Sequence, residues 1–87
     1  MANKNKSKIT FSCLHGNKYW FKGKYEKRIC YHREDGPAIE SISGTKYWFK
    51  NGELHYDKGP AVVFANGDLE YWLNGIKISK KHWLKTK

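Results

Sequence analysis

The 87-residue chain has no long apolar run. No segment approaches the length of a membrane span, and the residues after Met1 contain no apolar signal region. We therefore expect a protein that stays in the cytoplasm in which it is made and has no membrane partner. The two cysteines lie in separate segments. Without an export signal, this favours reduced thiols over a disulfide.

Acidic residues are also scarce, and they are unevenly distributed. The chain holds 8 Asp and Glu against 17 Lys and Arg, a net charge of +9. Residues 1–33 hold nine Lys and Arg against one Glu, residues 34–75 three Lys against seven acids, and residues 76–87 five Lys and no acid. Basic surfaces attract polyanions of any sequence by releasing counterions. The alternative is that the lysines only keep a ring-rich protein soluble.

The length leaves room for one small domain, which buries a modest share of its surface. Aromatic residues make up 16% of the chain, with four Trp, six Tyr and four Phe. Rings must therefore build most of the core. For a chain of this size we expect either marginal stability or a homo-oligomer.

A repeated unit organises the chain, and its complete copy is residues 44–61, GTKYWFKNGELHYDKGPA. Alternating residues lead to Asn51-Gly52, the pair that best fits a type I′ hairpin turn. Partial copies occupy residues 17–23, 32–38 and 66–75. The spacing is 24 residues from Trp48 to Trp72 and 23 from Pro37 to Pro60, but 28 from Trp20 to Trp48. The longer interval indicates an insertion around residues 25–29.

The pattern predicts an all-β fold, an antiparallel meander of about three hairpin repeats over residues 8–78. A disordered basic arm precedes it at residues 1–7, and a helix with a basic tail follows at 79–87. We expect strands at 9–14 and 18–22, an extended arm at 25–31, hairpins pairing 38–42 with 45–50 and 61–64 with 69–73, and a closing strand at 76–78. Ser79 should cap the helix, and Trp83 and Leu84 should fold back over the open end of the sheet.

Alternation along the strands assigns the side chains to two faces. One face should carry Tyr19, Phe21, Tyr47, Phe49, Leu69, Tyr71 and Leu73. The other should carry Trp20, Trp48, Glu70 and Trp72, with Lys18, Lys22, Lys46 and Lys50 interleaved. Rings that stack on bases, flanked by amines that reach phosphates, are typical of sequence-tolerant binding to single-stranded nucleic acid. The alternative is that each Trp is the core residue of its repeat, with the lysine stems lying along it.

The predicted ligand is RNA, bound without sequence preference. The candidate residues are cations of the two basic segments and of the tryptophan face, with two of its rings: Lys18, Lys22, Lys24, Lys27, Arg28, Arg33, Lys46, Lys50, Lys80, Lys81, Trp20 and Trp48.

Other chemistry finds less support. Cys13-Leu14-His15 and Cys30-Tyr31-His32 offer zinc-type ligands, but their spacing fits none of the common zinc modules, so we expect no metal and no other cofactor. His32 and His55 stand at the same repeat position, which predicts that both bond a turn. A His with a nearby carboxylate could serve a nuclease, but turns use the same residues to bond their own backbone. We therefore expect no catalysis.

The motifs HREDGPA, GTKYWFKNG and NGDLEYWLNG together resemble a class of short β-hairpin repeats similar to MORN repeats, found in bacteriophages and large DNA viruses. The resemblance covers residues 15–78, and residues 78–83 look like the helix that often caps the last copy. It implies a scaffold and does not assign a site.

The same resemblance implies a role. Small basic phage proteins of this kind often antagonise host defences, which suggests an RNA-binding inhibitor of a host enzyme such as a toxin ribonuclease, acting in the host cytoplasm. One alternative is a protein-only inhibitor whose acidic middle, residues 34–70, docks a basic host protein. Another is a passive phage structural or assembly module. Because a pure nucleic-acid binder gains nothing from an acidic centre, a partner that is itself a protein–RNA complex fits best.

Overall fold

The computed structural model describes residues 9–25 and 28–85, so the predicted arm at 1–7 lies outside it. Ten strands and one helix follow in chain order: β1 (Thr10–Leu14), β2 (Asn17–Tyr25), β3 (Arg28–Tyr31), β4 (Ile39–Glu40), β5 (Lys46–Tyr47), β6 (Phe49–Lys50), β7 (Glu53–Leu54), β8 (Val62–Val63), β9 (Leu69–Leu73), β10 (Ile76–Ile78) and α1 (Lys80–Lys85).

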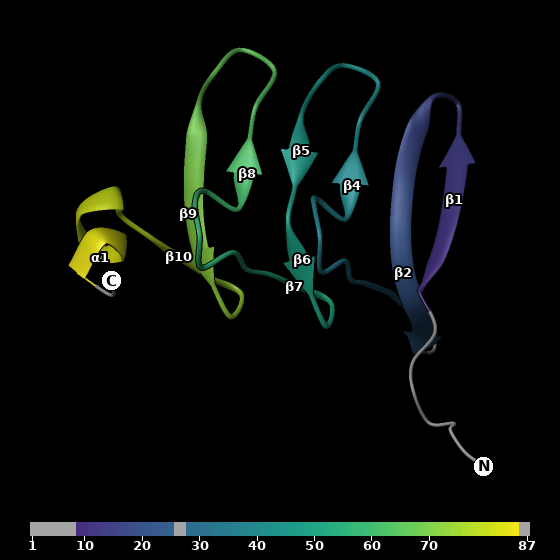
Figure 1. Ribbon diagram of the computed structural model, residues 1–87, viewed down its shortest axis with the longest axis horizontal. Helices are drawn as coiled ribbons and strands as arrows, with labels where there is room; N and C mark the ends of the chain where they lie inside the picture. Colours follow the sequence, from purple (N-terminus) through teal and green to yellow (C-terminus); the bar gives the residue numbers. More distant parts are fainter. Residues whose placement is uncertain (1–8, 26–27, 86–87) are drawn as a thin grey trace.

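The strands form an antiparallel meander. Most of them join one sheet in the order β1-β2-β4-β5-β8-β9-β10, with β3 attached to β2, while β6 and β7 pair separately. Figure 1 shows three hairpins side by side, with the connections β1–β2, β4–β5 and β8–β9 at the same end and α1 beyond the last hairpin. The predicted all-β fold with a short C-terminal helix is confirmed.

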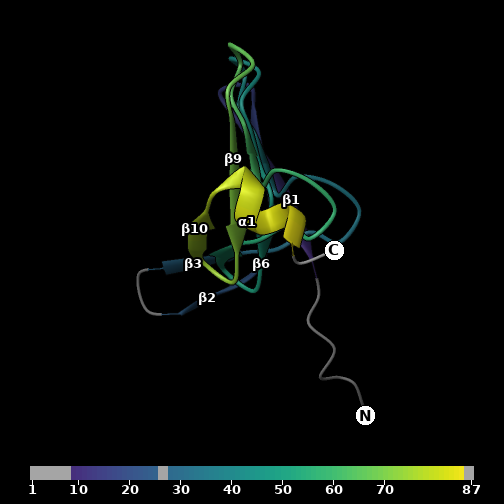
Figure 2. The ribbon, with the colours of Figure 1, turned by 90° about the vertical axis from the view of Figure 1, so that its left-hand side faces the viewer.

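The insertion in the first repeat lengthens a hairpin. Strand β3 pairs with β2, with Phe21 opposite Tyr31 and Lys24 opposite Ile29, and the register shifts between Phe21 and Lys24. The predicted extended arm is therefore one half of a hairpin. Figure 2 shows that this hairpin projects sideways from the sheet. Because the later repeats have only a short turn at this position, the projection is specific to the first repeat.

The tight turns have the predicted backbone. Asn51 and Gly52 have φ of 53° and 85°, and Asn74 and Gly75 have φ of 52° and 80°. Positive φ at both central residues is the requirement of a type I′ turn. The turn at His15 and Gly16 has the same signs of φ.

Backbone hydrogen bonds show a register of 23 residues between the second and third repeats. The Ala38 N–H donates to the Tyr47 carbonyl, and the Ala61 N–H donates to the Glu70 carbonyl. Tyr47 therefore corresponds to Glu70, and Trp48 corresponds to Tyr71.

The predicted alignment of Trp48 with Trp72 is wrong by one residue, because the Asn-Gly turns fix the register and the Trp residues do not. The predicted faces of the third repeat are consequently exchanged. Tyr71 packs on the face of Trp48, which we call the tryptophan face. Glu70 and Trp72 lie on the opposite, tyrosine face, and the Trp72 Nε1–H donates to the Glu70 Oε1 at 2.9 Å.

Alternating large and small residues form the core row of the tryptophan face. The Trp20 N–H donates to the Ala38 carbonyl at 2.8 Å, and the Trp48 N–H donates to the Ala61 carbonyl at 2.7 Å. Both alanines have no exposed surface, and Tyr71 is buried at the end of the row. A methyl group between two rings lets neighbouring repeats approach closely.

The C-terminal helix closes this row. The Ser79 hydroxyl accepts a hydrogen bond from the His82 N–H at 3.0 Å, which is the predicted N-cap. The ring of Trp83 lies 5.0 Å from the ring of Tyr71 and is buried. The prediction for Leu84 is wrong: its side chain is 54% exposed, because it leaves the helix on a side that does not face the sheet.

The two repeat histidines bond turns, as predicted. The Nδ1 of His32 accepts the Asn51 N–H at 2.9 Å, and the Nδ1 of His55 accepts the Asn74 N–H at 2.8 Å. Each histidine thus holds the Asn-Gly turn of the following repeat. An accepting Nδ1 places the proton of neutral His32 on Nε2, which lies 2.8 Å from the Glu34 carboxylate.

We predict that His32→Leu destabilises the protein by about 1 to 3 kcal/mol, because it leaves the buried Asn51 N–H without an acceptor. His32→Asn should cost less, because its Oδ1 stands close to the position of Nδ1. Equilibrium urea unfolding measures both. His82→Gln on the exposed side of α1 is the control and should be nearly neutral; an equal loss in all three variants would contradict the prediction.

Candidate nucleic-acid interface

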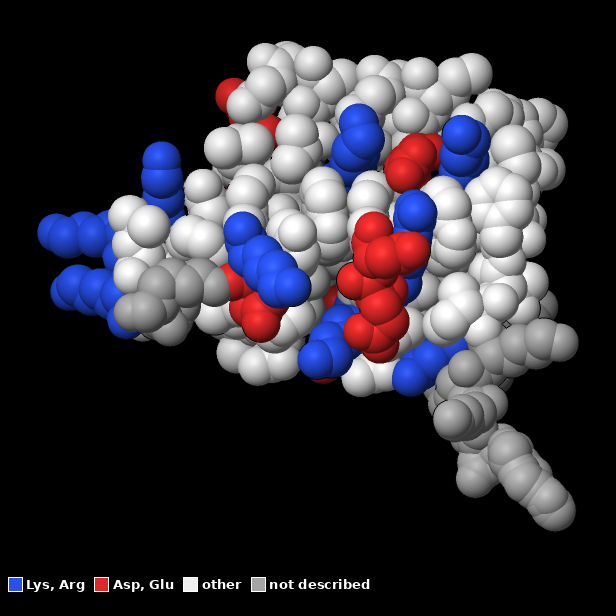
Figure 3. All heavy atoms as spheres, viewed as in Figure 1, with Lys and Arg blue, Asp and Glu red and all other residues white. Residues whose placement is uncertain are grey.

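Exposed lysines without ion pairs are the main feature of the surface. Among the side chains that the structure describes, Lys77 is the only lysine in an ion pair, with Glu70 at 3.3 Å. Figure 3 shows the Lys and Arg atoms gathered at the helix end, whereas over the middle they alternate with Asp and Glu. The helix end therefore offers cations that no neighbouring acid neutralises.

Helix α1 presents its lysines from a fixed base. Lys80, Lys81 and Lys85 are exposed, while Trp83 anchors the same helix against β9. Buried Trp83 orients the helix, so that its amines share the outer end of the molecule. Sequence analysis included Lys80 and Lys81 and omitted Lys85, although the helix length it predicted nearly reached this residue.

The projecting β2–β3 hairpin contributes the second basic group. Lys22 lies in β2 with a half-buried side chain. Lys24 and Arg28 belong to the paired strands of the hairpin, so their backbones stand at its tip. Their side chains and the whole of Lys27 lie outside the described part. The role of these residues in binding RNA therefore stays a prediction.

Lys18 and Lys46 lie on the tryptophan face, on either side of one acid. Glu40 pairs with Lys18 across one strand boundary and with Lys46 across the next. The Glu40 carboxylate is 3.2 Å from Arg33, and both lysines are exposed. This row gives two amines a local acidic neighbour, so it attracts a polyanion less strongly than the helix end does.

Arg33 belongs to the fold. Its guanidinium lies 3.7 Å over the Trp20 ring, bonds Asp35 and Glu40, and donates to the Pro37 carbonyl. A Cβ at position 36 would stand 2.9 Å from the Arg33 Cζ, so only glycine fits in that turn. The guanidinium is occupied by these contacts, and the predicted role of Arg33 in binding phosphate has no support in its geometry.

Trp20 is held by the same cluster. Its ring lies 4.8 Å from the Phe11 ring and under the Arg33 guanidinium, and its side chain is half-buried. These contacts favour the core interpretation of this residue over a free stacking platform.

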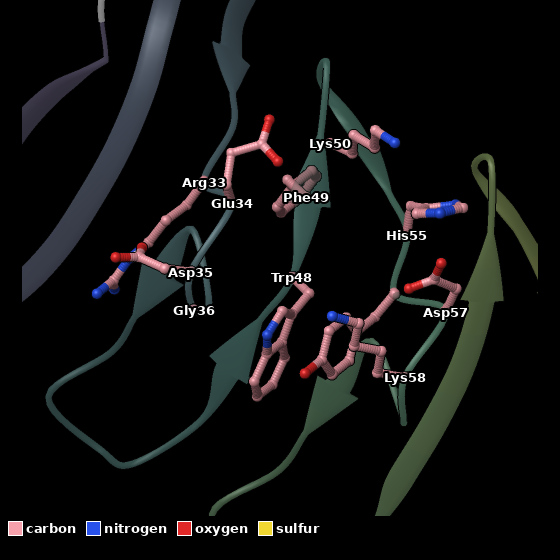
Figure 4. A pocket seen from close by; sticks show the side chains of 11 residues that line it. Arg33, Glu34, Asp35, Gly36, Trp48, Phe49, Lys50, His55, Asp57 and Lys58 are labelled. Carbon is pink, nitrogen blue, oxygen red and sulfur yellow. The ribbon is translucent and has the colours of Figure 1, made fainter.

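Trp48 lines a cleft between two successive turns. Its ring stacks on Tyr56 with 5.0 Å between centroids and 13° between planes. Tyr56 takes the place over Trp48 that Arg33 takes over Trp20, 23 residues earlier; sequence analysis missed this correspondence. Figure 4 shows residues 33–36 on one side of the cleft and residues 48–58 on the other.

The cleft has a volume of about 550 Å³ and carries both signs of charge. Lys50 and Lys58 supply exposed amines, while Glu34, Asp35 and Asp57 supply exposed carboxylates. The half-buried edge of the Trp48 ring is accessible between them. This arrangement suits a planar group with mixed polarity better than a bare phosphate.

Most acids of the middle segment are engaged by neighbouring groups. Glu34 bonds His32, while Asp35 and Glu40 bond Arg33. The Arg33 guanidinium holds the pKa of the Asp35 carboxyl below its ordinary value by hydrogen bonding and by charge. Asp68 bonds within its own turn through Asn66.

Glu70 is engaged in the same way, at the tyrosine face. Its pKa is lowered, mainly by the hydrogen bond from Trp72 and further by the bond and the charge of Lys77, against a small effect of burial. For Glu53 and Asp57, in contrast, the described residues include no hydrogen-bond or ion-pair partner. The acidic middle therefore consists largely of groups that hold turns and strands.

Neither zinc-type pair forms a site. Cys13 is exposed and Cys30 is buried, and both are free thiols, as predicted. Within residues 9–25 and 28–85, no three His, Cys, Asp or Glu side chains are gathered closely enough to hold a metal ion. The same residues include no helix long and apolar enough to cross a membrane.

Comparison of the chain with protein-family models, curated proteins and solved structures finds no match. The functional argument therefore depends on the geometry and charge of the chain itself.

We predict that Trp48→Ala lowers the free energy of unfolding by about 2 to 4 kcal/mol, because it removes a ring packed between Ala38, Ala61 and Tyr56. The double variant Lys46→Ala, Lys50→Ala should change stability by less than about 1 kcal/mol and weaken RNA binding. Urea unfolding and RNA titration measure the two effects. If Trp48→Ala unfolds normally and only binding suffers, the ring is a stacking platform.

A second prediction concerns acid. Because folding lowers the pKa of Glu70, its contribution is present above the ordinary glutamate range of about 4 to 5 and is lost as the pH falls through the folded-state value. Glu70→Gln should therefore lose less thermal stability than the wild type between pH 7 and pH 3. Melting curves across this range test it, with Glu53→Gln as the control. Parallel losses in Glu70→Gln and the wild type would contradict the assignment.

Proposed function

We propose that this chain binds RNA without sequence preference and has no catalytic activity of its own. The observation that carries the proposal is the helix end, where Lys80, Lys81 and Lys85 are exposed on an anchored helix with no ion pair among the described residues. Fixed amines at that spacing replace the counterions of a phosphate backbone, which supplies affinity for any sequence.

The acidic middle does not oppose this proposal. Three of its carboxylates bond His32 or Arg33, another bonds Trp72 and Lys77, and Asp68 bonds its own turn. Residues that hold the repeats together explain the acidic composition without an acidic docking surface. This supports RNA binding over a protein-only inhibitor that docks through residues 34–70.

The resemblance to phage repeat proteins extends the proposal to a biological role. An RNA-binding protein with two basic ends suits a host target that itself carries RNA, such as a toxin ribonuclease with its bound transcript. We propose that the chain antagonises such an enzyme in the host cytoplasm by holding it on RNA. A pulldown with and without nuclease treatment tests this extension, which fails if the capture of the host protein survives nuclease.

We predict that the affinity for a labelled single-stranded RNA falls steeply with salt. The log–log slope should be several units, at about 0.7 per phosphate neutralised, and the triple variant Lys80→Gln, Lys81→Gln, Lys85→Gln should reduce it by about 2. Fluorescence anisotropy between low and physiological salt measures the slope.

The matched control removes acids in place of bases. Glu53→Gln with Asp57→Asn should leave RNA binding unchanged or improve it, because it removes repulsion of the polyanion. A flat salt dependence of the wild type would refute RNA binding. If inhibition of a host target survives the lysine substitutions and fails with the acidic ones, the protein-only alternative is correct.

A further inference from the structure

Strand β1 is an edge strand without the usual protection. It is the first strand of the sheet, with β2 on one side and no described strand on the other. All five residues, Thr-Phe-Ser-Cys-Leu, are exposed, and none is charged, proline or glycine. At the opposite edge, the helix that follows β10 packs Trp83 on the sheet. An uncharged, uncovered edge strand is a template for another strand.

Exposed apolar side chains gather at this end of the molecule. Phe11 and Leu14 in β1 are each more than half exposed. On the tyrosine face, a groove of about 310 Å³ lies beside the strand, lined by Ser12, Leu14, Tyr19, Phe21, Ile29 and Tyr31. A partner strand along β1 would cover both the edge and the rim of this groove.

The turn at residues 15–16 determines which groups of β1 point outward. Leu14 and Asn17 flank this two-residue turn and are paired, so they exchange the narrow pair of hydrogen bonds. Bonding alternates along an antiparallel strand, and Ser12 therefore also bonds to β2. The N–H and C=O groups of Phe11 and Cys13 consequently point away from the sheet.

We propose that two copies of the chain join edge to edge through β1, antiparallel, with a twofold axis at Ser12. In this register Ser12 faces Ser12 of the second copy, Phe11 faces its Cys13, and Thr10 faces its Leu14. All five residues overlap, and the outward groups of Phe11 and Cys13 meet to form four hydrogen bonds. The result is one continuous sheet across both copies.

A second copy fits this edge for reasons of charge and continuity. With a net charge of +9, two chains repel unless they meet where charge is absent, and β1 is such a place. The joint also repeats the antiparallel pairing by which every hairpin of the sheet joins the next. A single strand pair is a small interface, so we expect reversible dimerisation with a Kd of roughly 10 to 100 µM.

This inference does not depend on RNA binding, but it has a consequence for it. The dimer would place the two first repeats next to each other, so that two basic segments of residues 1–33 share the centre of a longer sheet. Dimerisation is tested with nuclease-treated protein in high salt, so that failure here leaves the RNA proposal intact.

The register is tested by disulfide formation. The axis brings the Ser12 Cα atoms to about 4.5 Å, within the range of a disulfide, whereas the Cys13 Cα atoms stand roughly 8 to 9 Å apart, beyond it. The double variant Ser12→Cys, Cys13→Ser should therefore form a covalent dimer under mild oxidation, at least tenfold faster than the wild type with its native Cys13. Equal rates would overturn the proposed register.

The edge itself is tested with a matched pair. Cys13→Pro removes only an outward N–H and should leave the β1–β2 pairing intact, whereas Cys13→Ser keeps the N–H. Sedimentation of the wild type and Cys13→Ser at several hundred micromolar should show dimers, and Cys13→Pro should stay monomeric. A monomeric wild type, or a dimer that proline leaves unchanged, overturns the proposal. If circular dichroism shows that the proline variant is unfolded, the disulfide experiment decides.

Discussion

Two alanines without exposed surface determine how the repeats join. Ala38 and Ala61 each use both backbone groups between neighbouring strands, accepting from a Trp N–H on one side and donating to the next strand on the other. Each methyl group lies between two rings of the core row. A larger side chain would push the rings apart and lengthen these hydrogen bonds, which are among the few connections between repeats whose strands have only two residues. The Gly-Pro-Ala motif is therefore primarily a joint.

The sequence predicts the fold well because its turn residues act locally. Asn51-Gly52, Gly59-Pro60 and the Ser79 cap each determine the backbone within a few residues, so the hairpins and the helix appear where expected. The alignment failed at Trp72, because the eye follows rings while the register follows the Asn-Gly turns. Leu84 was misplaced because its side depends on how Trp83 seats on Tyr71, a long-range contact that no local pattern contains.

The candidate interface was only partly predictable for a related reason. Formal charge identified the basic ends, but it could not show that Arg33 is occupied by Trp20, Asp35 and Glu40 while Lys80 and Lys81 have no ion pair. Composition treats all cations alike, whereas partner geometry separates those that hold the fold from those available to a ligand. The same distinction explains the acids, most of which hold turns.

The two ends of the sheet differ in how they stop. At the C-terminal end a helix covers the last strand and turns its charged side outward, so that no strand can add there. At the N-terminal end the first strand is neutral, apolar and exposed, and the charge of its repeat is displaced onto the projecting hairpin. A chain with this much charge that leaves one edge uncharged separates two kinds of contact. Strand pairing is confined to β1, and polyanion binding to the hairpin and the helix.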